Sequence, residues 1–180
     1  MSTRIRHVVM LGLMGVGKTT IGRELGRALQ WPLSDSDRAI EERCGATVRE
    51  LNVRIGTEGM HRLEAEHLLH ALEQDAPSVI CAAASVVELP ECRRALATPG
   101  TYGVWLQGQA ETLAGRFAAG AHRPVFGSDP AAVLRNQLGQ RSRWFAEVAR
   151  QRVRVEGRTP EEIVADILAS LRTAGVTPPG

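Results

Sequence analysis

The sequence is poor in the residue types that mark several classes of protein. Its 180 residues include one tyrosine, three phenylalanines and three tryptophans, too few for an obvious surface on which nucleic-acid bases could stack. The three cysteines, Cys44, Cys81 and Cys92, are odd in number and show no C-x-x-C spacing. A disulfide framework or a zinc site is therefore not expected, and buried free thiols are.

Long apolar runs and long charged runs are also missing. No apolar stretch approaches the ~20 residues that a membrane-spanning helix needs. The formal net charge is only +2, and no run of five or six like charges occurs. The first apolar run leads directly into a glycine-rich loop and predicts a strand instead of a signal peptide. We expect a cytoplasmic monomer that acts on a small molecule, without a nucleic-acid or membrane partner.

Lysine is almost absent too, and the exception is informative. Of 22 basic residues, 21 are arginine and one is Lys18, in the stretch GLMGVGKTT. This stretch has the spacing G-x-x-x-x-G-K-[ST] from Gly12 to Thr19, which is typical of a phosphate-binding loop. The loop's backbone N–H groups and the N-terminus of the following helix bind phosphate oxygens. A compact ammonium fits such a loop better than a wide guanidinium does.

The flanking residues support this interpretation. His7–Leu11 is a short apolar run with two valines, and Thr19–Leu29 has apolar residues at helical spacing. A strand, a glycine loop and a helix in this order are the context that the motif requires. A glycine-rich turn that binds nothing is the alternative, and the context disfavours it.

Strands and helices alternate along the rest of the chain, which predicts an α/β fold with a parallel sheet covered on both faces. The expected strands are His7–Leu11, Pro32–Ser34, Ser78–Cys81, Tyr102–Leu106 and Arg152–Val155. The expected helices are Lys18–Gln30, Asp37–Cys44, Thr57–Glu73, Pro90–Ala97, Ala110–Phe117, Pro130–Ala149 and Pro160–Leu171.

The length fits a single domain, which we assign to residues 1–174, followed by a flexible tail at 175–180. Two segments lie outside the predicted sheet: an arginine-rich helical insertion within about 36–66, and a glycine-bearing segment at about 118–129. Ligands of open parallel sheets bind beyond the carboxyl ends of the strands. The first segment could hold an acceptor, and the second could close as a lid.

The acidic residues narrow the chemistry. GTPases usually carry N-K-x-D, which a chain whose only lysine is Lys18 cannot contain. Asp35 and Asp37 follow the second predicted strand, and both can point in one direction from an extended segment. One could hold water on Mg²⁺, while the other accepts a proton or a hydrogen bond from an acceptor hydroxyl. Both could instead only cap the next helix.

Five segments in order resemble the shikimate kinase family, over nearly the whole chain. They are GLMGVGKTT, DSDRAIEERCG, GTEGMHRLEAE, RFAAGAHRPV and RSRWFAEVA. The resemblance implies a three-layer αβα P-loop kinase fold with a five-stranded parallel sheet in the order 2-3-1-4-5. It also implies ATP, Mg²⁺ and phosphorylation of a hydroxyl on shikimate or a related small hydroxy acid.

The resemblance further implies roles for single residues on the donor side. Thr19 would bind Mg²⁺, and Asp35 would support the ion through water. Arg116 would pack against adenine, and Arg123 would close over the transferring phosphoryl group. The ATP phosphates would be held by the loop and helix residues Gly15, Val16, Gly17, Lys18, Thr19 and Thr20.

On the acceptor side, Asp37 would bind the acceptor hydroxyls and could act as the base, and Arg62 and Arg141 would grip a carboxylate. The chain departs from the family here. Ala82, Ala83 and Ala84 replace three pocket-lining glycines; we expect them to adopt ordinary φ/ψ angles, because left-handed alanines are strained. Further departures are His61, Arg143 and Phe145. A kinase for another sugar or polyol acid, and a silent regulatory paralogue, remain alternatives.

Overall fold

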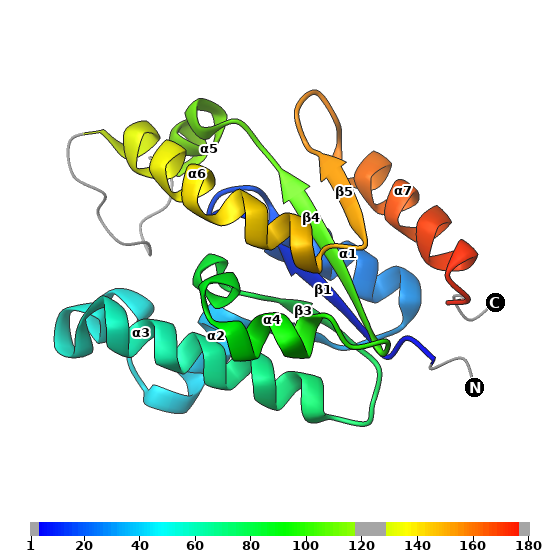
Figure 1. Cartoon of the computed structure of the whole chain (residues 1–180), viewed down its shortest axis with the longest axis horizontal. Helices are drawn as coiled ribbons and strands as arrows, with labels where there is room; N and C mark the ends of the chain where they lie inside the picture. Colours follow the sequence, from blue (N-terminus) through cyan, green and yellow to red (C-terminus); the bar gives the residue numbers. More distant parts are fainter. Residues whose placement is uncertain (1–3, 118–128, 177–180) are drawn as a thin grey trace.

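The computed structural model describes residues 4–117 and 129–176. A single five-stranded parallel sheet runs through them in the order β2-β3-β1-β4-β5, as Figure 1 shows. This confirms the predicted sheet, with strand bounds that agree to within a residue. The strands are β1 (His7–Leu11), β2 (Leu33–Asp35), β3 (Ser78–Cys81), β4 (Thr101–Gln107) and β5 (Gln151–Arg154).

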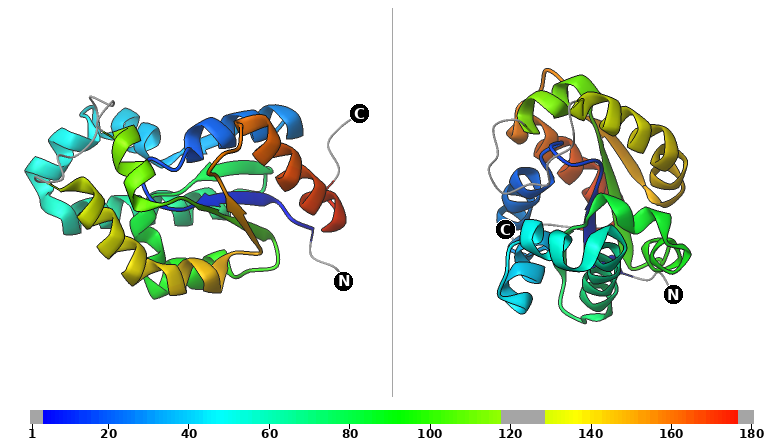
Figure 2. Two further views of the ribbon diagram at one scale, coloured as in Figure 1. Left: turned by 90° about the horizontal axis from the view of Figure 1, so that it is seen from above. Right: turned by 90° about the vertical axis from the view of Figure 1, so that its left-hand side faces the viewer.

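Helices cover both faces of the sheet and create the three layers. Figure 2 shows α1 (Lys18–Leu29) and α7 (Pro160–Thr173) together on one face, and α4 (Pro90–Leu96) and α6 (Pro130–Val148) on the other. All five residues of β1 are buried between these layers. A strand covered on both faces is mostly apolar, which explains why HVVML carries no alternation, and the ring of its one polar residue, His7, is hydrogen-bonded to Ser78 and to the carbonyl of Gln74.

The parallel register brings the carboxyl ends of three neighbouring strands to one edge. Leu11 ends β1 beside β3, which ends at Cys81, and Asp35 at the end of β2 pairs with Cys81. The phosphate-loop segment, the acidic segment and the three alanines follow these ends directly. The topology therefore gathers the three segments that the sequence singles out.

The insertion consists of α2 (Ser36–Cys44) and α3 (Val48–Glu73), which pack on each other around a small separate core of Ile40, Leu51 and Met60. The helical region of α3 begins earlier than the predicted Thr57, because Thr47 and Glu50 form a capping box. Gly56 interrupts it with φ 70° and ψ 176°, angles that glycine alone adopts readily. The predicted start at Thr57 thus coincides with a real break.

The three alanines adopt ordinary backbone angles, as expected. Among the described residues, Gln30 is the only non-glycine with positive φ. Ala83 has φ −63° and ψ 151° and leads from β3 into a short 3₁₀ helix, η1 (Ala84–Glu88). The segment is therefore unstrained, and its methyl groups change the volume and stiffness of the site.

The remaining helix, α5 (Ala110–Phe117), packs on α6 at the end of β4. At the C-terminal end, Gly175 closes α7 with φ 87°, and Val176 is buried with its N–H donating to the carbonyl of Leu171. These two residues of the predicted tail are therefore held by the fold, while 177–180 lie outside the described residues.

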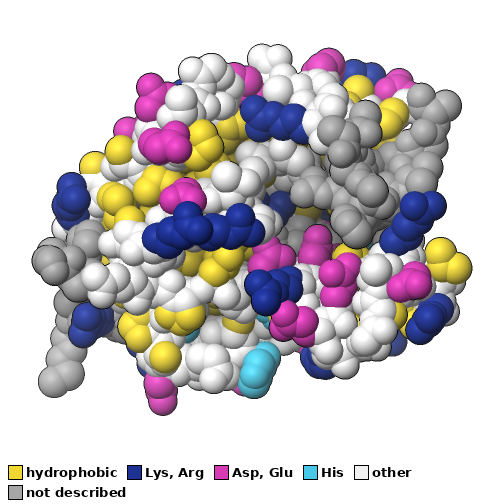
Figure 3. Space-filling model, turned by 180° about the vertical axis from the view of Figure 1, so that it is seen from behind, with side chains coloured by type: hydrophobic (Ala, Val, Ile, Leu, Met, Phe, Trp, Pro, Cys, Tyr) yellow, Lys and Arg dark blue, Asp and Glu magenta, His cyan; other side chains and the backbone are white. Residues whose placement is uncertain are grey.

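Basic and acidic side chains are interspersed on the face that Figure 3 shows, without a continuous basic field. Among the described residues, none of the helices combines the length and apolar character needed to cross a bilayer.

Candidate active site

The loop between β1 and α1 has the backbone of an anion-binding turn. Gly12, Gly15 and Gly17 have φ values of 137°, 81° and 100°. A Cβ on Gly12 would lie 2.6 Å from the carbonyl oxygen of Leu106, so both the angle and the space require glycine. Gly17 directly precedes α1 and offers no side-chain cap. The first N–H groups of the helix consequently point into the loop.

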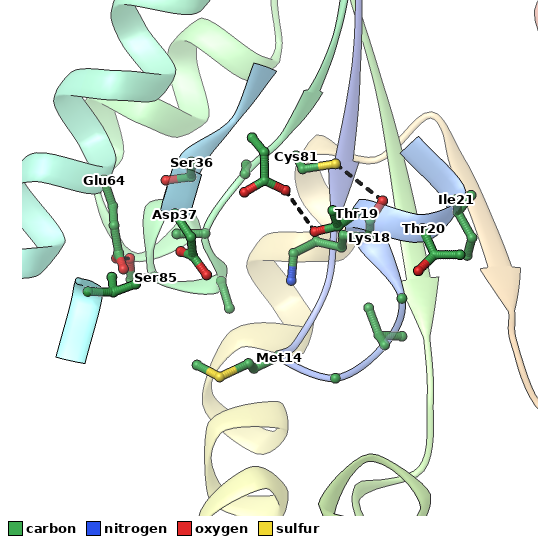
Figure 4. A pocket seen from close by; sticks show the side chains of 18 of the residues that line it. Met14, Lys18, Thr19, Thr20, Ile21, Ser36, Asp37, Glu64, Cys81 and Ser85 are labelled. Carbon is green, nitrogen blue, oxygen red and sulfur yellow. Dashed lines mark hydrogen bonds between the residues drawn. The ribbon is translucent and has the colours of Figure 1, made fainter. Parts of the chain in front are cut away.

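Lys18 reaches back across this loop. Its Nζ donates hydrogen bonds to the carbonyl oxygens of Gly12, at 2.9 Å, and Leu13, at 3.1 Å. The ammonium is thereby placed over the hollow that the loop amides surround. Figure 4 shows it pointing toward the side from which Asp37 enters.

Thr19 and Asp35 form a compact set of oxygen atoms beside the loop. The Thr19 hydroxyl donates to Oδ2 of Asp35 at 2.7 Å, as the dashed line in Figure 4 shows. The other carboxylate oxygen, Oδ1, accepts from the backbone N–H of Arg38 at 3.4 Å and caps α2. Asp35 therefore both caps a helix and reaches the loop, so the two interpretations of this residue do not exclude each other.

A cavity of about 760 Å³ extends from the loop to the insertion. Asp37, at the start of α2, and Glu64, on α3, point into it, and Figure 4 shows both. Ala82, Ala83 and Ala84 line the wall between them. The loop forms one end of the cavity, and α3, η1 and α6 form the other.

The far end contains a buried guanidinium that is already paired. Arg141 on α6 keeps 8% of its side chain exposed, and its Nε donates to Oε1 of Glu88 at 2.6 Å. Glu88 ends η1, and its Oε2 lies 3.9 Å from Nδ1 of His61. Desolvation lowers the pKa of His61, against the attraction of Glu88, so the ring is neutral at pH 7.

Glu64 lies between this cluster and the loop. Desolvation raises its pKa to about 7, a hydrogen bond from the Ser85 hydroxyl opposes the rise, and the charge of Asp37 adds to it. Arg141 and Lys18 lower it. Near neutral pH this carboxyl is consequently divided between its acid and its carboxylate form.

Comparison with known proteins explains this arrangement. The family model described as shikimate kinase matches residues 14–172. The chain belongs to the shikimate kinase family. Shikimate kinase of Symbiobacterium thermophilum is 36% identical over 172 residues, covering 94% of this chain and 98% of that protein. Shikimate kinase of Corynebacterium glutamicum is 37% identical over 165 residues, covering 91% and 95%.

Solved structures agree on the fold. Shikimate kinase from Acinetobacter baumannii in complex with shikimate has a TM-score of 0.89 at 24% identity, with 97% of both chains covered. Shikimate kinase from Bacteroides thetaiotaomicron has a TM-score of 0.81 at 25% identity, covering 92% of this chain and 98% of that one. A gluconokinase from Sinorhizobium meliloti has a TM-score of 0.60 at 20% identity, covering 95% and 94%, which indicates a shared fold alone.

Membership makes the chain an ATP-dependent phosphotransferase that acts on a hydroxyl and uses Mg²⁺. The residues present fit the ion. Mg²⁺ is usually held by one or two protein oxygens together with phosphates and waters. Thr19 and Asp35 provide such a pair, whereas no group of three or more His, Cys, Asp or Glu that could hold a metal occurs in the described ranges.

Most residues predicted for the site share the one cavity. Its lining includes Gly15, Val16, Gly17, Lys18, Thr19, Thr20, Asp35, Asp37, Ala82, Ala83, Ala84, Arg116 and Arg141. Arg123 and almost the whole predicted lid lie outside the described residues.

Arg62 is the exception on the acceptor side. It lies outside the cavity lining, is 72% exposed in its side chain, and pairs with Glu58 one turn earlier on the same helix. Neighbouring residues of a helix point about 100° apart, and here this turn directs His61 toward the cavity and Arg62 toward solvent. His61 lines the cavity, and a histidine thus occupies the inward position for which the sequence predicted an arginine.

Two of the other departures also lie away from the cavity. Phe145 is fully buried and stacks on Trp105 with ring centroids 5.5 Å apart, and the Arg143 guanidinium lies 4.5 Å from the Trp144 ring centroid. Neither lines the cavity. The substitutions that bear on the acceptor are therefore His61 and the three alanines.

Sequence reasoning missed His61, Glu64 and Glu88 as site residues. For the first two a signal existed: Thr57, Met60, His61 and Glu64 follow the i, i+3, i+4, i+7 pattern of one helix face. For Glu88 none existed, because the 3₁₀ turn that directs it to Arg141 has no sequence signature here.

Proposed function

We propose that this chain transfers the γ-phosphoryl group of ATP to a ring hydroxyl of shikimate or of a closely related acceptor. The observation that carries the proposal is the shared cavity: Lys18 and the loop amides stand at one end, and Asp37 and Arg141 stand beyond them. Phosphoryl transfer depends mainly on positioning and on stabilising negative charge. A donor end and an acceptor end within one cavity supply both.

Each residue has a proposed task. The loop amides and Lys18 hold the ATP phosphates, and Thr19 and Asp35 hold Mg²⁺, which offsets charge on the phosphate oxygens. Asp37 accepts a hydrogen bond from the attacking hydroxyl and takes its proton. Arg116 lies against the adenine, and Arg123 closes over the phosphoryl group.

The insertion at 36–66 serves as the acceptor-binding segment of a single domain, and 118–129 as its lid. In this scheme His61 replaces Arg62 at the acceptor. We propose that the reaction takes place in the cytoplasm, where ATP is available. One chain supplies both ends of the cavity, so the scheme requires neither a second copy nor nucleic acid.

A coupled assay with ATP, Mg²⁺ and a panel of hydroxylated ring acids, polyols and sugars tests the proposal. We expect ADP formation that depends on the acceptor, and its loss in Lys18→Ala. Lys18→Arg is the matched control for charge: it keeps the cation but widens it, and we expect it to be inactive as well. No acceptor-dependent ADP from a folded wild-type protein, across the whole panel, would refute the kinase proposal and favour a silent paralogue.

A further inference from the structure

We infer that Glu88 sets the charge specificity of the acceptor end: by occupying Arg141, it turns the site away from carboxylate acceptors and toward ring polyols that carry an uncharged or ammonium group instead. The inference rests on the proposed kinase function and narrows its substrate class.

The first step concerns the cation. Arg141 is the guanidinium at the acceptor end of the cavity, and its Nε already donates to Glu88 at 2.6 Å. A second carboxylate at the same guanidinium would lie close to the first. Like charges at such distances oppose each other strongly in a partly buried site. An acceptor carboxylate must therefore displace Glu88 or bind beside its charge.

The second step concerns the other charges. Among the described residues, Asp37 and Glu64 line this end, Glu88 adjoins it through its pair with Arg141, and His61 is a further ionisable neighbour of that pair. The arginines elsewhere in the lining do not compensate: Arg158 pairs with Asp166 at 2.7 Å, and Arg116 belongs to α5. Lys18 serves the phosphate loop. Within residues 4–117 and 129–176, the acceptor end thus carries more negative than positive charge.

The third step concerns hydrogen bonding. The carboxylates of the protein can only accept hydrogen bonds, and the same holds for a carboxylate on the phosphoryl acceptor. Hydroxyl, carboxamide N–H and ammonium groups can donate to Asp37 and to Glu64, which line the cavity. A ligand rich in hydrogen-bond donors fits the cluster, whereas a ligand carboxylate would place one hydrogen-bond acceptor against another.

The test compares shikimate with its carboxamide, which keeps the ring and its hydroxyls and removes the charge. Binding of both is measured by titration calorimetry in the presence of Mg²⁺ and ADP, for wild type, Glu88→Gln and Glu88→Ala. We expect wild type to bind the carboxamide about ten-fold or more tightly than the acid. Both variants should shift this ratio toward the acid by about ten-fold or more, with the affinity for ADP unchanged.

Glu91→Gln provides the matched control, because it removes the same charge from an exposed position on the neighbouring α4. We expect it to leave the ratio unchanged. A wild type that binds the acid as tightly as the carboxamide, together with an unchanged ratio in both Glu88 variants, overturns the inference. Because the readout is binding, it decides the charge preference even if turnover is absent and the kinase proposal fails.

Discussion

At the scale of single residues, the site depends on how much charge the fold buries. Glu64 illustrates this, because its carboxyl is held in the cavity by α3 while Ser85, Asp37, Arg141 and Lys18 face it from four other segments. Desolvation is the largest of these influences. Burial and not pairing therefore decides its protonation.

Glu64→Gln should make stability less dependent on pH. The pKa of Glu64 is raised in the folded state to about 7 from 4.5, so ionisation disfavours folding. Wild type accordingly loses stability from this group as pH rises between about 4.5 and 7, and glutamine removes that loss. Urea unfolding at pH 5 and pH 8 should show that the variant gains relative to wild type at pH 8.

The control for this measurement is Glu66→Gln on the same helix, whose side chain is 63% exposed. It should change the free energy of unfolding by a similar small amount at both pH values. An equal effect of both variants at pH 8 would show that Glu64 ionises as freely as a surface carboxyl.

At the scale of elements, the phase of α3 decides which side chains meet the acceptor. Arg62→Ala should alter the acceptor KM by less than about two-fold, because an exposed ion pair contributes little. Arg141→Ala should raise the KM for shikimate by about ten-fold or more, since it leaves Glu88 as an uncompensated negative charge at the acceptor end. Steady-state kinetics at saturating ATP distinguish the two; equal losses would place Arg62 in the site.

The break at Gly56 yields a second prediction for this element. Gly56→Ala should lower the free energy of unfolding by roughly 1–3 kcal/mol, because φ 70° with ψ 176° disfavours a Cβ even though no atom lies within 4 Å of it. Gly139→Ala in α6 is the contrasting control: it also meets open space, but it is helical, so alanine should stabilise it by about 0.5–1 kcal/mol. Equal effects in urea titrations would contradict the strain at Gly56.

These elements also show what the sequence could and could not predict. Strand bounds and the phosphate loop followed from local patterns, because apolar runs and glycines act over a few residues. The rotational phase of α3 did not follow from the sequence. The resemblance to the family placed Arg62 at the acceptor, whereas the helix turns His61 inward. The Glu88–Arg141 pair joins residues 53 positions apart, and only the tertiary structure brings them together.

At the scale of the whole molecule, the cavity joins segments from the first strand to α7, so a ligand that fills its donor end should stabilise the fold. A nucleotide that binds only the folded chain, at 100 times its Kd, adds about 2.7 kcal/mol. For a domain of 180 residues each kcal/mol raises Tm by about 2–4 °C. Saturating ADP with Mg²⁺ should therefore raise Tm by roughly 5–10 °C in a thermal scan. Lys18→Ala should lower the unliganded Tm by roughly 4–8 °C, because its two hydrogen bonds to loop carbonyls contribute about 1 kcal/mol each. It should lose most of the ADP-dependent shift. An undiminished shift in that variant would mean that the nucleotide stabilises the chain without the loop lysine, and would contradict the phosphate-binding role of Lys18.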